Sequence, residues 1–338
     1  MTSTRSAREV HQKKFRDHRL VQRWQDGYRE AISGGVSIRL PYGEQGNFIS
    51  DSTAAMSYDM MLKQGERLMV SVDAPGAVFS QLRSGNAILV ESDSLGTVQF
   101  TAQRTGAHRL IVQPGMVTNG LFRLKVERDA SLSFPVAGKG NASIQSFWAD
   151  ERDGGKRRHE GIDIFAKRGT PVVAVADGFI TYTGERGLGG KQVWQRTGLF
   201  GHSIYYAHLD AVTVAGGQRV RTGDTLGFVG NTGNAKHTAP HLHFGIYTAS
   251  GAVDPLPFVY RHKPISISDF KVFSKTAIKV KTARANIRKS PDVAGEVIAQ
   301  APRSARLLVM GQSRDWLHVR SDDGRRGFVH RSVVSAVN

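Results

Sequence analysis

The sequence predicts a mainly β protein of several domains: an N-terminal helical arm, a β-sandwich, an antiparallel β domain and a small C-terminal barrel. Three observations support this prediction. Short runs of alternating apolar and polar residues recur along the chain, a pattern typical of strands with one buried face. The 37 glycines and 11 prolines fall largely between such runs. The length of 338 residues suits about two to three domains.

The first element is a helical arm over residues 1–34. Its polar sequence carries Val21, Trp24, Tyr28 and Ile32 at helical spacing. We expect this apolar stripe to dock on the following domain. The same segment has positive charge but no apolar core, so it does not read as a secretory signal.

The next two elements are both β-rich. Residues 35–131 contain "RLMVSV", "TVQFTA", "HRLIVQ" and "LFRLKV", which alternate as strands of a β-sandwich do. No cluster of reactive side chains occurs there, so we expect an accessory domain. Residues 132–262 hold β-branched runs and Gly-rich turns, which predict an antiparallel β domain. Residues 263–274 read as a linker, and 275–338 as a small module of short strands.

The amino-acid composition favours some classes of binding partner and excludes some kinds of reactive site. The net charge of +17 favours a polyanion: a nucleic acid, an anionic membrane or an acidic cell-wall polymer. Residues 275–338 hold 13 Lys or Arg against 5 Asp or Glu, so this module is the best candidate for anion contact. The absence of cysteine excludes disulfides, thiolate metal sites and cysteine nucleophiles. No window approaches the roughly 18 apolar residues of a membrane span.

Two short motifs predict a metal site. In "APHLHFGIY" (239–247), His241 and His243 lie two apart, so on a strand they share one face. In "HEGID", His159 and Asp163 lie four apart, again one face of a strand. These two residues with one histidine of the first motif make a two-His, one-carboxylate set. Such donors suit catalytic zinc with one position left for water; the same donors also suit non-haem iron.

Three segments together carry a family resemblance. "RRHEGIDIFAKRGTPVVAVADG", "YYAHL" and "GNTGNAKHTAPHLHFGI" resemble, in this order, the lysostaphin-type (LytM-like) zinc endopeptidases of bacterial peptidoglycan. The resemblance covers residues 134–260. It implies one zinc ion with His159, Asp163 and His243 as ligands. It also implies that His208 and His241 are unliganded catalytic histidines, without saying which of them is the base.

One feature of some relatives is missing. They carry a tyrosine upstream of the first ligand that stabilises the transition state, whereas this chain reads "SFWADERDGGKRR" there. A second resemblance lies at the C-terminus, where Asn286-Ile287-Arg288, Trp316 and Gly327-Phe328-Val329 resemble bacterial SH3-like domains, which often bind cell-wall material. Trp316 itself reads more simply as a core residue.

These observations predict a zinc metalloendopeptidase that hydrolyses peptidoglycan cross-links. We expect it in the cell envelope, periplasmic or secreted, in contact with peptidoglycan stem peptides and anionic envelope polymers. The alternative is a catalytically silent wall-binding scaffold that activates another hydrolase. A nucleic-acid partner rests on charge alone and is not expected, because no nucleic-acid-binding module is recognisable. The bond cleaved and the oligomeric state are not predicted.

Overall fold

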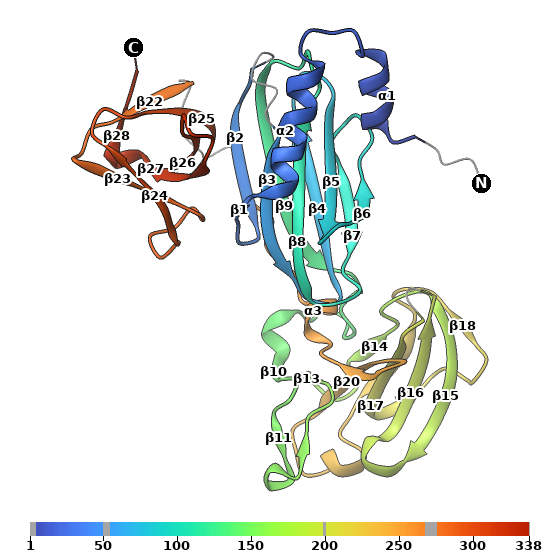
Figure 1. Cartoon of the computed structure of the whole chain (residues 1–338). Coiled ribbons are helices and arrows are strands. Elements are labelled where there is room, and N and C mark those ends of the chain that lie inside the picture. The colour runs from blue at the N-terminus through green and yellow to red at the C-terminus, as the bar shows by residue number, and fades with distance from the viewer. Residues whose placement is uncertain (1–4, 50–54, 199–200, 268–275, 338) are drawn as a thin grey trace. The chain divides into compact units, whose positions relative to one another are not determined.

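The computed structural model describes residues 5–49, 55–198, 201–267 and 276–337. The chain divides into two compact units: unit 1 holds residues 1–63, 67–128 and 263–338, and unit 2 holds residues 64–66 and 129–262. Strands dominate both units, with short helices at the N-terminus (Figure 1), so the predicted mainly β fold with N-terminal helices is confirmed. Within the described part, no helix combines the length and apolar character needed to cross a membrane.

Unit 1 contains two sheets that share one core. The first sheet has the order β1 (Val36–Ser37), β3 (Met56–Leu62), β8 (Gly106–Pro114), β5 (Val78–Ser84) and β6 (Ala87–Glu91). The second contains β2 (Tyr42–Phe48), β9 (Gly120–Ala130), β4 (Glu66–Asp73) and β7 (Val98–Thr101). Alternate residues of both sheets are buried in one cluster that includes Tyr58, Leu110 and Phe122.

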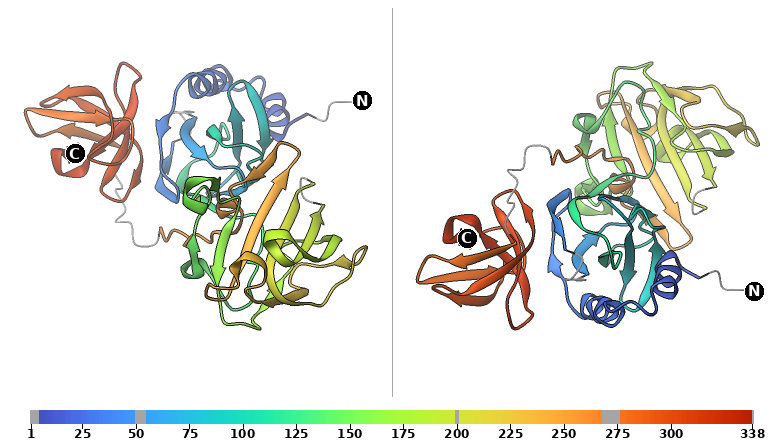
Figure 2. Two further views of the ribbon diagram at one scale, coloured as in Figure 1. Left: turned by 90° about the horizontal axis from the view of Figure 1, so that it is seen from below. Right: turned by 90° about the horizontal axis from the view of Figure 1, so that it is seen from above.

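Two helices pack on the other face of the first sheet. They are α1 (Ala7–Lys14) and α2 (Val21–Ser33). Trp24 of α2 is fully buried with Phe79 and Met116, and its indole donates a hydrogen bond to the carbonyl of Pro114 (2.7 Å). Figure 2 shows these helices beside the strands. The expected docking of the apolar stripe on the next domain is therefore confirmed.

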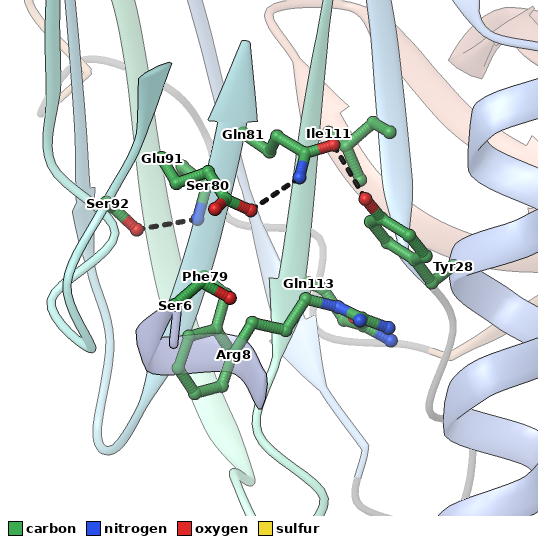
Figure 3. A pocket seen from close by; sticks show the side chains of 10 residues that line it. All are labelled: Ser6, Arg8, Tyr28, Phe79, Ser80, Gln81, Glu91, Ser92, Ile111 and Gln113. Atoms are coloured by element: carbon green, nitrogen blue, oxygen red, sulfur yellow. Dashed lines mark hydrogen bonds between the residues drawn. The ribbon is translucent and has the colours of Figure 1, made fainter. Parts of the chain in front are cut away.

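Polar contacts also attach this arm to the sheet. Arg8 donates to Gln113 (2.8 Å) and its guanidinium lies 3.6 Å from the ring centre of Tyr28. Tyr28 donates to Gln81, which in turn donates to Glu91 (Figure 3). The cavity between them measures about 10 Å³, which is room for about one water molecule. These residues therefore fix the arm and leave no space for a larger ligand.

The C-terminal strands continue the second sheet of unit 1. They are β22 (Ala277–Val280), β23 (Arg284–Arg288), β24 (Val297–Pro302), β25 (Arg306–Ser313), β26 (Trp316–Arg320), β27 (Arg326–His330) and β28 (Val334–Ala336). β25 pairs with β2 through Gln312 and Gln45. Trp316 is half-buried and packs against the two-sheet core.

Unit 2 is built on a large sheet of mostly antiparallel strands. Its main path runs β10 (Ile144–Ser146), β13 (Ile162–Phe165), β20 (His241–Thr248), β17 (Ser203–Val212), β16 (Gly190–Thr197), β15 (Gly178–Arg186) and β18 (Arg219–Val220). β14 (Pro171–Val173), β19 (Thr225–Val229) and β21 (Gly251–Val253) pair beside it. The small pieces are the hairpin of β11 (Glu151–Arg152) and β12 (Arg157–Arg158), and α3 (Leu256–Val259).

One face of this sheet is the core of unit 2. Leu242 and Phe244 of β20 are fully buried in it, together with Ile204 and Tyr206 of β17. Because side chains alternate along a strand, the residues between them point to the opposite face. The apolar residues of β20 thus fix the direction in which its two histidines project.

Candidate metal centre

Three predicted ligands meet on the face of the sheet opposite the core. Asp163 and His243 lie directly opposite each other on the neighbouring strands β13 and β20. Asp163 Oδ1 is 3.1 Å from His159 Nε2 and 3.1 Å from His243 Nδ1, and the two nitrogens are 3.0 Å apart. Three donor atoms therefore form a small, nearly equilateral triangle.

His159 reaches this triangle from a loop. β13 begins at Ile162, so the expectation that His159 and Asp163 share a strand face is wrong. The chain turns at Gly161, where an added Cβ would lie 2.6 Å from His243 Cε1 and 2.7 Å from the carbonyl oxygen of Phe244. No larger residue fits there without displacing the imidazole of His243, so glycine permits the close approach of loop and strand.

The donor set fits a divalent metal ion such as zinc. Nδ1 of His159 lies 2.8 Å from the carbonyl of Phe147. A carbonyl only accepts, so Nδ1 carries the proton and the lone pair of Nε2 faces the triangle. Ligand atoms around tetrahedral zinc, at bonds of about 2.0–2.2 Å, lie about 3.3–3.6 Å apart, close to the separations found. Among the described residues, this is the one group of three such side chains close enough to share a metal.

Electrostatics keep the carboxylate charged. Burial by itself raises the pKa of Asp163, but the neighbouring His159 and His243 outweigh this effect and hold that pKa well below its usual value. Burial also lowers the pKa of His243. An ionised carboxylate and a neutral imidazole are the protonation states that metal binding requires.

Two further histidines lie beside the triangle. The ring centre of His208 is 5.1 Å from that of His241 and 5.8 Å from that of His243. Nδ1 of His241 lies 2.8 Å from the carbonyl of Ala239, and Nδ1 of His208 lies 2.9 Å from that of Thr232. Each Nδ1 therefore donates its proton to a carbonyl, which leaves each Nε2 with a free lone pair.

The backbone turns His208 out of the core. By strand alternation it would follow Ile204 and Tyr206 into the interior. Instead its φ is +63°, and the pairing of β17 becomes irregular just after it. A left-handed non-glycine residue of this kind costs on the order of 1–3 kcal/mol and is found preferentially at functional sites. The result is an imidazole that lines the same cleft as His241 and His243.

Burial keeps the ring of His208 neutral. Loss of contact with water, followed by the neighbouring imidazoles of His243 and His241, lowers the pKa of His208 to about 4. The ring is therefore neutral around pH 7. In this state its Nε2 accepts a hydrogen bond.

All five residues border one cleft of about 740 Å³. Two aromatic residues of its floor were not identified from the sequence. Tyr205 stands edge-on to His243 with ring centres 5.7 Å apart, and Tyr247 follows two positions after Gly245 on β20. Tyr247 lies four residues after His243 on β20, and Tyr205 lies two residues before Ala207, which pairs with His243. Even spacing along a strand places side chains on one face, so this spacing was the signal in the sequence that could have identified both tyrosines. Other residues of the lining include Ser146, Arg152, Arg157, Arg158, Glu160, Leu188 and Asn234.

Comparison with known proteins agrees with this geometry. Residues 157–255 match the model of peptidase family M23, and residues 283–335 match that of the bacterial SH3 domain. The chain is 38% identical over 135 residues to the DD-carboxypeptidase/endopeptidase Mpg of Neisseria meningitidis, covering 40% of this chain and 30% of that protein. It is 40% identical over 108 residues to the glycyl-glycine endopeptidase ALE-1 of Staphylococcus capitis, covering 30% of this chain and 29% of that protein.

A solved structure adds one further likeness. The catalytic domain of lysostaphin from Staphylococcus simulans is 34% identical, with 34% of this chain and 89% of that one covered and a TM-score of 0.31. The chain spans less than a third of the length of the two curated relatives above. Within that limit, both predicted resemblances are confirmed: the chain carries a peptidase family M23 domain of the lysostaphin type, followed by a bacterial SH3 domain.

Proposed function

We propose that this chain is a zinc metalloendopeptidase that hydrolyses peptide cross-links of bacterial peptidoglycan. One observation carries the proposal. The donor triangle of His159, Asp163 and His243 lies in an open cleft beside two unliganded histidines, His208 and His241, whose Nε2 atoms are free. A metal-binding triangle alone fits a structural site, whereas neighbouring proton acceptors and access for a substrate are features of catalysis.

The three ligands have distinct tasks. His159 and His243 are neutral donors, and Asp163 brings the single negative charge of the set. Zinc held there would supply Lewis-acid chemistry, polarising the scissile carbonyl and lowering the pKa of a water to about 7. The carbonyl of Phe147 fixes the tautomer and orientation of His159 through its Nδ1–H.

His208 and His241 move the proton. Each imidazole is held by a carbonyl at Nδ1, and one of the two Nε2 atoms accepts the proton of the attacking water and later passes it to the leaving amine. The imidazole that is not used in this way is placed to contact the oxygen of the tetrahedral intermediate. The equivalent placement of both rings explains why sequence spacing does not distinguish their roles.

The substrate class follows from the two domain families together. The named relatives include a DD-carboxypeptidase/endopeptidase and a glycyl-glycine endopeptidase, so the same metal machinery serves different bonds. Residues 35–131, which we interpret as a β-sandwich accessory domain, and the SH3 domain would place the enzyme on the wall. The SH3 region exposes basic side chains toward anionic envelope polymers: Lys279, Lys281, Arg284, Arg303, Arg306, Arg314, Arg325 and Arg331. Such a substrate places the working protein in the cell envelope.

Mass spectrometry of digested peptidoglycan tests the proposal. Purified peptidoglycan is incubated with the protein and, in parallel, with His243→Ala. New peptide termini that appear only with the intact site support the enzyme and identify the bond. If cross-links survive in both samples while the protein sediments with the wall, the scaffold alternative holds instead.

A further inference from the structure

The segment before the first ligand makes contacts that the sequence did not indicate. It lacks the tyrosine found in some relatives but places Arg152 of β11 at the cleft. Nη2 of Arg152 donates to Asp163 Oδ2 at 3.1 Å and also to Ser146 Oγ. The donor triangle contains the other oxygen of this carboxylate, Oδ1. The two oxygens of one carboxylate thus have separate partners.

The same segment also holds His159. Ser146 Oγ lies 3.3 Å from His159 Nδ1, and the carbonyl of Phe147 lies 2.8 Å from that nitrogen. Asp150 accepts hydrogen bonds from the backbone N–H of Phe147 (2.7 Å) and from Ser146 Oγ (3.3 Å). Residues 146–152 therefore form one connected network that reaches two of the three ligands.

A short hairpin keeps this network in register with the ligand loop. β11 pairs with β12, Arg152 opposite Arg157, and β12 leads directly into His159. The backbone N–H of His159 donates to the carbonyl of Asp150, and that of Ala149 donates to the carbonyl of His159, both at 2.9 Å. Movement of the hairpin would therefore shift Arg152 and His159 together.

We propose that Arg152 is a positioning residue of the metal centre. By holding Asp163 through Oδ2, it keeps Oδ1 directed at the point shared with His159 and His243, and through Ser146 it couples that carboxylate to His159. The inference rests on the proposed function and adds a residue to it. Partners behind metal ligands fix ligand orientation, and their loss typically lowers metal affinity or activity by about 10- to 100-fold.

Zinc affinity is the direct measure of this role. It is determined by competition with a chromophoric chelator for the full chain and for Arg152→Gln, Arg152→Lys and Arg219→Gln. Arg219 is an exposed arginine on β18 of the same unit, outside the cleft, and serves as the matched control. We expect Arg152→Gln to weaken zinc binding about 10- to 100-fold. Arg152→Lys should recover part of this loss, because its ammonium reaches one of the two oxygen partners, and the control should be unchanged.

Kinetics separate positioning from substrate binding. About 29% of the Arg152 side chain is exposed and the residue lines the cleft, so contact with substrate is the competing role. At saturating zinc we expect Arg152→Gln to keep the KM of the full chain for a peptide substrate. A raised KM with unchanged zinc affinity would assign Arg152 to the substrate and overturn the inference, as would a zinc affinity within twofold of the parent.

A milder variant guards against misfolding. Ser146→Ala removes only the hydroxyl that joins Arg152 to His159, and we expect it to weaken zinc binding in the same direction with an unchanged circular dichroism spectrum. Unchanged zinc affinity in this variant would overturn the coupling between the two ligands. The parent protein, run beside the variants, reports on the proposed function separately: if it neither binds zinc nor cleaves, that function fails and the inference with it.

Discussion

Two clusters in this chain join a carboxylate to histidine, and they differ in access to solvent. In unit 2, Asp163 with His159 and His243 borders an open cleft. In unit 1, Glu44 and His318 are sealed in the interior, with side-chain exposures of 0% and 1%. His318 Nδ1 lies 3.0 Å from Glu44 Oε1, although the two residues are 274 positions apart.

The hydrogen bonds explain why only one cluster suits chemistry. Oε2 of Glu44 accepts from Tyr42 (2.5 Å) and Tyr58 (2.9 Å), and Oε1 faces His318. Burial, followed by the charge of Glu44, raises the pKa of both tyrosines, so they remain hydrogen-bond donors. Three buried side chains thus converge on the carboxylate of Glu44, and the contact with His318 joins the two-sheet domain to the SH3 domain. In the cleft, by contrast, three potential metal-ligand atoms face one another beside solvent-accessible space.

The largest expected effect comes from the unliganded histidines of the cleft. His208→Asn and His241→Gln should each lower kcat by about 100- to 10,000-fold, the usual contribution of a positioned proton-transfer group. Zinc content should stay at the parent value, because neither residue belongs to the donor triangle. Steady-state kinetics with metal analysis measures both quantities. A kcat loss below tenfold, or loss of zinc, would contradict the assigned roles.

The buried cluster should respond in stability instead. Glu44→Ala leaves His318 and two tyrosine hydroxyls without their partner inside the protein, and we expect a loss of about 3–5 kcal/mol in the free energy of unfolding. Hydrogen exchange of the β2 and β26 amides (Figure 1) locates the change in unit 1. Zinc binding in unit 2 should be retained. Unchanged exchange at these amides would show that the pair does not hold the SH3 domain.

The two clusters also show what sequence can and cannot predict. His241 and His243 were placed correctly because period-two alternation around Leu242 and Phe244 fixes their face. His208 departs from alternation through a left-handed backbone, so only the family resemblance marked it. Arg152 and Ser146 act from the ends of the short strands β11 and β10, and Glu44 meets His318 through tertiary packing. No local pattern encodes such contacts.

The pH dependence of stability offers a finer test within the cleft. The unfolded chain protonates His208 near pH 6.5, whereas the folded domain does so only near pH 4. Between these values protonation favours the unfolded chain, so stability that is complete above pH 6.5 is lost as the pH falls toward 4. Metal-free His208→Asn should lose less stability over this range, by up to about 3 kcal/mol at 1.36 kcal/mol per pKa unit. Urea unfolding at pH 7.5, 5.5 and 4 measures the difference, and parallel curves would contradict it.

The smallest effect is expected at an ion pair on the surface. Arg123 and Asp73 of unit 1 lie 3.2 Å apart, with 47% and 77% of their side chains exposed. Water solvates both charges in the folded and unfolded states, so Asp73→Ala should cost less than about 1 kcal/mol, and less still at high salt. Urea unfolding at low and high salt checks this, and a loss as large as that of Glu44→Ala would contradict it. If the expected order holds, burial and the number of satisfied hydrogen bonds decide what an acidic side chain contributes. The carboxyl group itself, which Asp73 and Glu44 share, does not.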